Sequence, residues 1–336
     1  MTGAPSGWDD AAVRSPGGHV LQSTAWATVR AEQGWRPQFV RIGDPLPLAL
    51  VLWRDLPPGQ RLAYVPRGPI VASANDLPHA LDALARLARE QRAVFMKVDP
   101  ELTADDAARA LRAAGFARAE DIQPVLATLV LDLTPAEEAL FAALEKDTRW
   151  SVRQAEKRGI TLRDAAGERD LRALYDLYAE TGRRAGFITR TWDYYRRMWG
   201  TLSDAGFAKV RLAEREGRAV AGALVWRCGE REVYQSAATN DEGRTAYAAY
   251  ALLWRCIIEA KRGGARLLDF GGIPQDVTRK DDPMYGPYQF KKGFGGTPRR
   301  FVGAHDVVPN PVAYRAYRVL EPAYTAALRV VGRLRG

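Results

Sequence analysis

The chain has 336 residues, of which 47% are hydrophobic and 26% are charged, and these proportions exclude a wholly disordered protein. The length favours two domains or one large one, because single hydrophobic cores seldom grow beyond about 250–300 residues. The net charge of +9 comes mostly from arginine. This excess favours polyanionic partners such as phosphates, nucleic acid or an anionic membrane face, although a coding bias toward arginine would produce it too.

Composition also disfavours membrane-spanning and metal-dependent proteins. No apolar stretch approaches the roughly 18–20 residues of a membrane span, and no signal peptide opens the chain, so we expect a cytoplasmic protein. Cys228 and Cys256 form no CxxC pair, and His19, His79 and His305 are scattered. We therefore expect two buried reduced thiols, no metal site and no Ser-His-Asp triad.

The first half of the chain predicts three strands, a helix and a fourth strand. Alternating β-branched and aromatic residues indicate the strands, and leucines and alanines three or four positions apart give the helix an apolar face. The strands are expected at 38–42, 48–53, 62–65 and 94–98, and the helix at 76–91.

The same order of elements recurs later in the chain. Strands are expected at 208–214, 219–227, 232–237 and 266–270, and a helix at 246–262. Tyr64 and Asp99 of the first set are matched by Tyr234 and Asp269, each 170 positions later. This agreement predicts a duplicated β-β-β-α-β unit.

The repeated unit resembles an acetyltransferase-like (GNAT) domain and differs from the βαβαβ order of a dinucleotide-binding fold. The sequence also lacks the GxGxxG and GxxxxGK[ST] phosphate loops. We predict an α/β (α+β) protein with two tandem acetyltransferase-like domains, whose mixed sheets are flanked by helices. The domains are expected at 1–160 and 161–304, with a hinge near 159–167.

Two predicted helices carry basic residues. Within 135–159, Arg149, Arg153 and Lys157 recur every four residues and share one helix face, which could follow the phosphates of a nucleic acid or could simply be a solvated face. The second helix, expected at 309–333, presents arginines on a basic side. These are Arg315, Arg318, Arg329 and Arg333.

A glycine-rich segment near the end of the second unit is a candidate for chemistry. The strand at 266–270 runs into Gly271-Gly272, a polar loop follows at 275–287, and Lys291 then lies between Phe290 and Gly293. Glycines let the backbone approach a ligand closely, and a desolvated lysine acts strongly on a developing oxyanion. The alternative is a loop lysine beside a packed aromatic ring. The polar loop could be a lid or a disordered insert.

A set of motifs resembles the FemABX family of non-ribosomal peptidyltransferases. They occur in that family's order and span nearly the whole chain. They are Leu21-Gln22-Ser23 to Trp26, Tyr64-Val65-Pro66-Arg67-Gly68-Pro69, Lys97-Val98-Asp99-Pro100, Lys146-Asp147-Thr148-Arg149-Trp150 to Gly159, Asp269-Phe270-Gly271-Gly272, and Phe290-Lys291-Lys292-Gly293-Phe294-Gly295. The chain lacks a sustained heptad run, so it resembles a short, FemX-like form without the coiled-coil arm of longer members.

The resemblance implies transfer of an aminoacyl group, such as glycine, alanine or serine, from aminoacyl-tRNA to the side-chain amine of a peptidoglycan stem peptide. The acceptor would be a UDP-linked or lipid-linked muropeptide. An aminoacyl ester is already activated, so the reaction demands no metal, ATP or other cofactor. The resemblance further implies that 305–336 packs back on the first domain. We expect a monomer that could touch the inner face of the membrane peripherally.

The resemblance also implies roles for individual residues. Lys291, which follows Phe290, matches the catalytic lysine, and Asp99 matches a carboxylate proposed as the base, although the substrate or the tRNA sugar could take the proton instead. Substrate-binding roles fall on Phe290 and on four further positions. Arg190 and Tyr194 match residues that hold the acceptor's diphosphate, Arg30 matches a first-domain cation there, and Tyr234 matches a site tyrosine. Each of them could instead be structural.

Two other functions stay open on the sequence. A CoA-dependent N-acyltransferase of the GNAT type would need a [QR]xxGx[GA] turn before the helix at 246–262, where 240–245 reads NDEGRT instead. A non-enzymatic RNA-binding protein would use the basic helix faces but would leave the segment around Lys291 unexplained.

Overall fold

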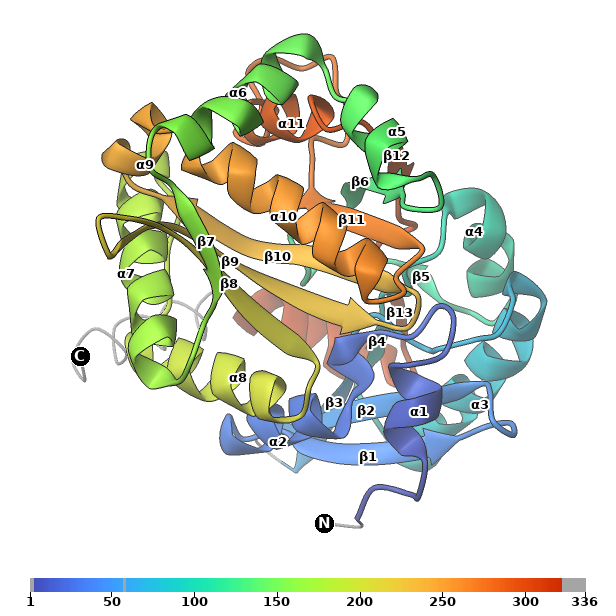
Figure 1. Ribbon diagram of the computed structural model, residues 1–336. Coiled ribbons are helices and arrows are strands. Elements are labelled where there is room, and N and C mark those ends of the chain that lie inside the picture. The colour runs from blue at the N-terminus through green and yellow to red at the C-terminus, as the bar shows by residue number, and fades with distance from the viewer. Residues whose placement is uncertain (1–2, 57–58, 322–336) are drawn as a thin grey trace.

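The computed structural model describes residues 3–56 and 59–321, which form two mixed β-sheets with helices on their faces (Figure 1). The first sheet has the strand order β1-β2-β3-β4-β13-β5. Its strands are β1 (Arg36–Arg41), β2 (Leu48–Leu56), β3 (Gln60–Val65), β4 (Met96–Val98), β5 (Ala117–Arg118) and β13 (His305–Val307).

The second sheet has the strand order β12-β6-β11-β10-β9-β8-β7. Its strands are β6 (Ala127–Asp132), β7 (Thr161–Asp164), β8 (Ala208–Arg215), β9 (Arg218–Cys228), β10 (Arg231–Thr239), β11 (Leu267–Gly272) and β12 (Thr297–Arg300).

The helices divide between the two sheets. Those in the first part of the chain are α1 (Trp8–Ala12), η1 (Val20–Gln22), α2 (Thr24–Glu32), η2 (Ala74–Asp76), α3 (Leu77–Glu90) and α4 (Ala104–Ala113). The later ones are α5 (Glu137–Ala142), α6 (Lys146–Lys157), α7 (Glu168–Ala185), α8 (Trp192–Asp204), α9 (Asp241–Thr245), α10 (Ala248–Arg262) and α11 (Tyr285–Lys292).

The predicted repeat is present in the order of the elements. In each sheet three antiparallel strands are followed by a helix and a fourth strand, and this fourth strand runs parallel to the third, as β4 does to β3 and β11 to β10. The pairing registers differ, however. Tyr64 lies opposite Lys97, whereas Val233 lies opposite Asp269, so the equal sequence spacing does not carry over to equal strand positions. Asp269 also lies within β11 and not after it.

One segment belongs to a different sheet from the one that the expected domain bounds suggest. Strand β6, at 127–132, pairs with β11 and β12 of the second sheet, whereas β7, at 161–164, pairs with β8 of that sheet as those bounds imply. The expected hinge at 159–167 therefore contains a paired strand. The division of the chain into domains at 160/161 stays a prediction, but the second sheet draws its strands from both sides of it.

Hydrophobic side chains of the described residues form three large cores, besides a small one of Leu62, Val94, Phe95 and Ala313. One core lies between the sheets, where Leu50 of β2, Trp199 of α8 and Leu212 of β8 are buried together. A second lies between the first sheet and α3, whose leucines and alanines face it. The third lies under α10, which crosses the second sheet in Figure 1. The shared first core holds the two sheets against each other.

After β12 the chain returns to the first sheet. β13 pairs antiparallel with β4 and β5, and a helix then covers 311–321 up to the last described residue. Tyr314 and Tyr317 of this helix pack their rings on Phe95. Arg329 and Arg333 lie outside the described residues. Within residues 3–56 and 59–321, no helix combines the length and the apolar character needed to cross a membrane.

Candidate active site

Lys291 lies in the last turn of α11, a short helix at the edge of the second sheet. The sequence leaves a loop lysine as an alternative and predicts a polar loop at 275–287, but 285–292 is helical. The side chain is 9% exposed, and its Nζ donates a hydrogen bond of 2.6 Å to the carbonyl oxygen of Gly272. Burial lowers the pKa of Lys291 to about 8, against the opposing charge of Asp269.

The turn that receives Lys291 depends on glycine. Gly271 has φ +73°, and a Cβ there would lie 3.0 Å from the carbonyl oxygen of Tyr234 and 4.0 Å from Lys291 Nζ. Asp269 fixes this turn, because its Oδ1 accepts hydrogen bonds from the Gly271 amide, at 2.7 Å, and from the Thr128 hydroxyl. A carboxylate and a lysine are thus held on one tight backbone turn.

Asp99 directly follows β4 of the first sheet. Its Oδ2 accepts a hydrogen bond of 2.8 Å from the Tyr64 hydroxyl, and its Oδ1 accepts one of 2.6 Å from the amide of Arg67. Arg67 has a left-handed backbone with φ 51°, so the carboxylate holds a bend that most residues avoid. Burial raises the pKa of Asp99 to about 6, although the charge of Arg67 opposes the shift.

Val125 connects the surroundings of Asp99 with those of Lys291. The Arg67 guanidinium donates a 2.9 Å hydrogen bond to the Val125 carbonyl oxygen. On the other side, a Cβ placed on Gly272 would lie 3.1 Å from the Val125 side chain. Val125 therefore contacts both Arg67, whose amide binds Asp99, and Gly272, whose carbonyl oxygen accepts from Lys291.

The predicted diphosphate-binding residues also come together, from α2 and α8. Arg30, in the last turn of α2, packs over the ring of Trp35 at 5.0 Å, and its buried Nε has no hydrogen-bond partner among the described residues. Burial is the largest cause of the lowered pKa of Arg30. The neighbouring Tyr194, Tyr64 and Arg190 also affect this pKa. The exposed Arg190 lies over the Tyr194 ring at 5.7 Å. These side chains therefore present two cations beside Tyr64, which itself bonds Asp99.

Tyr234 and Phe290 take part in packing. Tyr234 is buried in the core under α10, where burial raises the pKa of its hydroxyl well above its ordinary value and Cys256 raises it further. Phe290 contacts Tyr250 edge-on at 4.9 Å and Phe294 at 5.5 Å. These contacts explain both residues by core packing, and their assignment to the substrate stays a prediction.

The basic stripe on α6 is only partly available to a ligand. Arg149 donates a 2.6 Å hydrogen bond to the Ala142 carbonyl oxygen, and the Arg153 guanidinium lies 5.2 Å from the ring centre of Phe141. Lys157 is exposed. The start of α6 contacts the end of α11, because the Glu145 amide donates to the Gly293 carbonyl oxygen at 3.0 Å, and Figure 1 shows the two helices together. The stripe therefore begins next to Lys291.

Sequence reasoning missed three charged residues that surround the two carboxylates. Arg67 stood in a quoted motif without a role, and Glu101 follows the Lys97-Val98-Asp99-Pro100 motif directly. Arg231 stood in no motif. All three are largely buried, and they meet because Glu101 lies 3.4 Å from Arg67 and 2.7 Å from Arg231. Glu101 and Arg231 come into contact only because the two sheets pack against each other.

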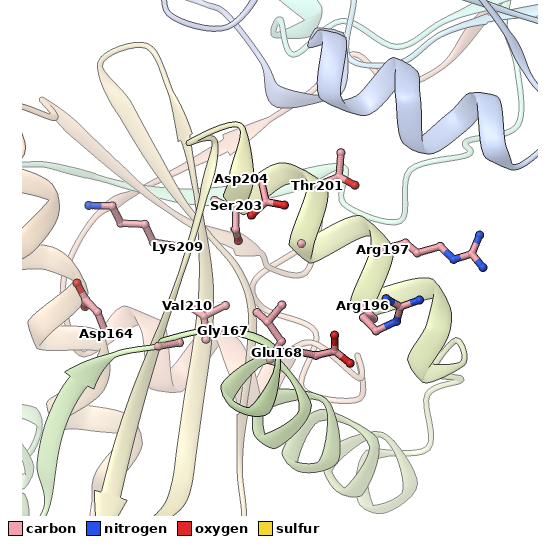
Figure 2. A pocket seen from close by; sticks show the side chains of 14 residues that line it. Asp164, Gly167, Glu168, Arg196, Arg197, Thr201, Ser203, Asp204, Lys209 and Val210 are labelled. Carbon is pink, nitrogen blue, oxygen red and sulfur yellow. The ribbon is translucent and has the colours of Figure 1, made fainter.

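A cavity of about 580 Å³ lies elsewhere in the molecule. Figure 2 shows its lining from the β7–α7 turn, α8 and β8, with charges of both signs from Glu168, Arg196, Asp204 and Lys209. None of the predicted site residues lines it. Its size alone does not make it the active site, because the groups suited to acyl transfer lie around Lys291.

Known proteins resemble the chain over nearly its whole length. The sequence profile described as the FemAB family matches residues 9–122, 114–218 and 205–322. A protein named Lipid II:glycine glycyltransferase from Staphylococcus saprophyticus is 26% identical over 397 aligned positions that include 95% of each chain, and one of the same name from Staphylococcus aureus is 25% identical over 402 positions. Both alignments exceed the 336 residues of this chain, so these relatives carry insertions.

The fold has a solved counterpart. A crystal structure of FemX superposes with a TM-score of 0.83 at 23% identity, covering 94% of this chain and 98% of the other. The longest helix among the described residues is α7, with 18 residues, so the part of the chain that the structure describes contains no coiled-coil arm.

Proposed function

The chain belongs to the FemAB family, and from this premise we propose that it is an aminoacyltransferase of peptidoglycan bridge formation. It transfers an aminoacyl group from aminoacyl-tRNA to the side-chain amine of the stem peptide of a lipid-linked precursor. Two relatives named as lipid II:glycine glycyltransferases support the lipid-linked acceptor and make glycine the first amino acid to test. The observation that carries the proposal is the buried Lys291 ammonium, held on the Gly272 carbonyl in the turn that Asp269 fixes.

The proposed chemistry is aminolysis of an ester. The acceptor amine attacks the ester carbonyl carbon, a C–N bond forms, the C–O bond to the ribose breaks, and the amine's proton ends on the ribose oxygen. Negative charge develops on the carbonyl oxygen in between, and a positive group preorganised in a dry site stabilises it most effectively. Lys291 suits this role, because a pKa of about 8 leaves most of it protonated at pH 7.

Asp99 is a candidate for the general base, and it also has a structural role. A pKa of about 6, raised by burial, leaves the carboxylate mostly ionised at pH 7 and able to accept a proton. Both of its oxygens already accept hydrogen bonds from Tyr64 and Arg67. We therefore propose that it orders the acceptor side of the site and that the ribose oxygen receives the proton at the end of the reaction.

The acetyltransferase alternative finds less support in the local structure. α9 begins where a GNAT protein would bind the CoA pyrophosphate, and its first turn carries Asp241 and Glu242. Two carboxylates at a helix N-terminus repel an anionic ligand from the position that favours one.

The experiment is a transfer assay with glycyl-, alanyl- and seryl-tRNA against lipid-linked and UDP-linked acceptors. We expect product on the lipid-linked acceptor with one of these tRNAs. Lys291→Ala should lower kcat about 10²–10³-fold with little change in acceptor KM, because an oxyanion contact acts mainly in the transition state. The exposed neighbour Lys292→Ala is the matched control. Full turnover by a folded Lys291→Ala enzyme would remove the lysine from the mechanism.

A further inference from the structure

Glu101 is an acidic residue of the first sheet's β4–α4 connection that faces three basic groups. Its side chain is 17% exposed. Its Oε2 lies 2.7 Å from Arg231 Nη2, and its Oε1 lies 3.4 Å from Arg67 Nε and 3.6 Å from His19 Nε2. His19 Nδ1 accepts a hydrogen bond from the Leu21 amide, so a neutral ring carries its proton on the nitrogen that faces Glu101.

Arg231 begins β10 of the second sheet, and it touches carboxylates of both sheets. Besides the contact with Glu101, its Nη1 lies 3.6 Å from Asp269 Oδ2 on the neighbouring strand β11. Its side chain is 18% exposed. One guanidinium therefore joins Glu101, which the first sheet supplies, to Asp269, which fixes the turn under Lys291. Charges this far from water are retained only when they are paired.

We propose that the Glu101–Arg231 ion pair, which joins the two sheets, positions Asp269 near Lys291. Glu101 and Arg231 are then positioning residues for the lysine. The expected effect on kinetics rests on the proposed function. The contacts between Glu101, Arg231 and Asp269 do not depend on any substrate. Glu101 neutralises Arg231, and Arg231 holds the carboxylate whose charge Lys291 experiences.

The arrangement predicts opposite electrostatic effects from its two members. Glu101→Gln removes a negative charge and leaves Arg231 free to draw Asp269 away, so the pKa of Lys291 should fall by about half a unit to one unit. Arg231→Met removes a positive charge and should raise that pKa. The double variant Glu101→Gln/Arg231→Met removes both charges, so the Lys291 midpoint should return most of the way to the wild-type value, and the remaining difference measures the release of Asp269 from Arg231.

Other ionisable groups surround the lysine and stay unchanged in these variants. They are Arg231 in the Glu101→Gln protein, Tyr234 on β10, Glu145 and Asp147 at the start of α6, Tyr250 on α10, and Tyr285, Tyr288 and Lys292 on α11. Asp269 on β11 carries the charge that opposes the burial of Lys291. Glu137→Gln, which breaks an ion pair with Arg262 on the far end of α10, is the matched control for loss of one carboxylate.

The experiment measures Lys291 directly. The chain has eight lysines, so protein labelled with 13C at lysine Cε gives a short set of resonances, and the Lys291 signal is the one that Lys291→Arg removes. Titration from pH 6 to 11 should show a lower midpoint in Glu101→Gln, a return in the double variant and no change in Glu137→Gln. The double variant does not leave Glu101 facing the place of its 2.7 Å partner, as Arg231→Met does, so it keeps the test available if Arg231→Met does not fold.

The outcomes separate this inference from the proposed function. Equal Lys291 midpoints in wild type, Glu101→Gln and the double variant would overturn it and leave the ion pair as packing alone. If transfer activity is found, the alkaline limb of kcat/KM should move with the Lys291 midpoint, and a limb that stays in place while the midpoint moves would also overturn it. If no transfer occurs with any acceptor while the midpoints move as expected, the proposed function fails and the positioning of Lys291 stands.

Discussion

At the scale of single residues, the site holds charged side chains at buried positions, where loss of water destabilises the charged form. Lys291 is buried among the aromatic residues of α10 and α11, and burial lowers its pKa to about 8, against the opposing charge of Asp269. An unfolded chain would restore the ordinary value of 10.5. The folded state thus binds this proton less tightly than the unfolded state does. Below about pH 8 the lysine costs stability, and the cost disappears as the pH rises through 10.5.

We therefore expect Lys291→Met to stabilise the fold while it removes activity. At pH 7 the free energy of unfolding should rise by on the order of 1–3 kcal/mol, reduced by about 1 kcal/mol because the Gly272 carbonyl loses its donor. The gain should shrink between about pH 8 and pH 10.5. Urea unfolding at several pH values measures it, with the exposed Lys292→Met as control. A Lys291→Met protein less stable than wild type at pH 7 would contradict this account.

At the residue level, the sequence singled out residues that stand inside a motif. These are Lys291, Asp99, Arg30, Arg190 and Tyr194, and their roles stay predictions, although Tyr64 lies close to both Asp99 and Arg30 in the structure. Arg231 had no local signal. Its role follows from a contact with Glu101, 130 positions away, and no short pattern contains such a contact.

At the scale of elements, the sequence predicted the strands and the helix of each repeated unit and left other segments unassigned, including the long helices α7 and α8. The strands from β1 to β4 and from β8 to β11 fall within a few residues of their expected places, because alternation over five or more positions marks a half-buried strand. β5, β12 and β13 have two to four residues and follow the pairing offered by their neighbours. The sheet to which β6 belongs depends on packing between distant segments, which periodicity does not encode.

The acceptor-binding region depends on the contact between α2 and α8. Thr191 caps α8, its hydroxyl accepting from the Tyr194 amide, so the loop that carries Arg190 ends at a fixed point. Arg30 reaches the same place from the last turn of α2. Arg30 of α2 and Arg190 of the loop before α8 thus lie near each other, and a diphosphate can bind both through paired hydrogen bonds.

We expect Arg190→Ala to raise the acceptor KM about 10–100-fold with little effect on kcat, since a diphosphate contact is made equally in the ground and transition states. Arg172→Ala is the matched control, because Arg172 also lies over an aromatic ring, Trp192, near the same loop. Steady-state kinetics with varied acceptor give both constants. If only the KM for tRNA rises, the two substrates occupy the opposite ends of the site.

At the scale of the whole molecule, the basic residues that give the net charge of +9 must lie on surfaces where they do not block the active site. The α6 stripe is one such surface, since it begins beside the end of α11 and Lys157 is exposed. Arg149 and Arg153 also contact Ala142 and Phe141, so their charges are held in place at the α5–α6 junction. Fixed cations lose less conformational freedom when they meet a phosphate than free ones do.

The last prediction concerns tRNA binding and its dependence on salt. If Arg149, Arg153 and Lys157 contact phosphates, each contact releases counterions, and removing one lowers the slope of log affinity against log salt by roughly 0.7–0.9. Side chains cannot read the deep groove of A-form RNA, so we expect little dependence on tRNA sequence and discrimination mainly at the aminoacyl end. Arg149→Gln, Arg153→Gln and Lys157→Gln together should lower the slope by about 2–3.

The measurement is equilibrium binding of a charged tRNA at several salt concentrations. Neutral substitutions suit it better than charge reversal, because a glutamate at position 149 or 153 would disturb the contacts with Ala142 and Phe141. The matched control is Arg86→Gln/Arg89→Gln/Arg112→Gln, which removes the same charge from exposed positions on α3 and α4 of the first sheet. A purely non-specific attraction to the net charge would make the two triple variants equal. A reduced slope in the α6 variant alone would place the tRNA along α6, next to the helix that carries Lys291.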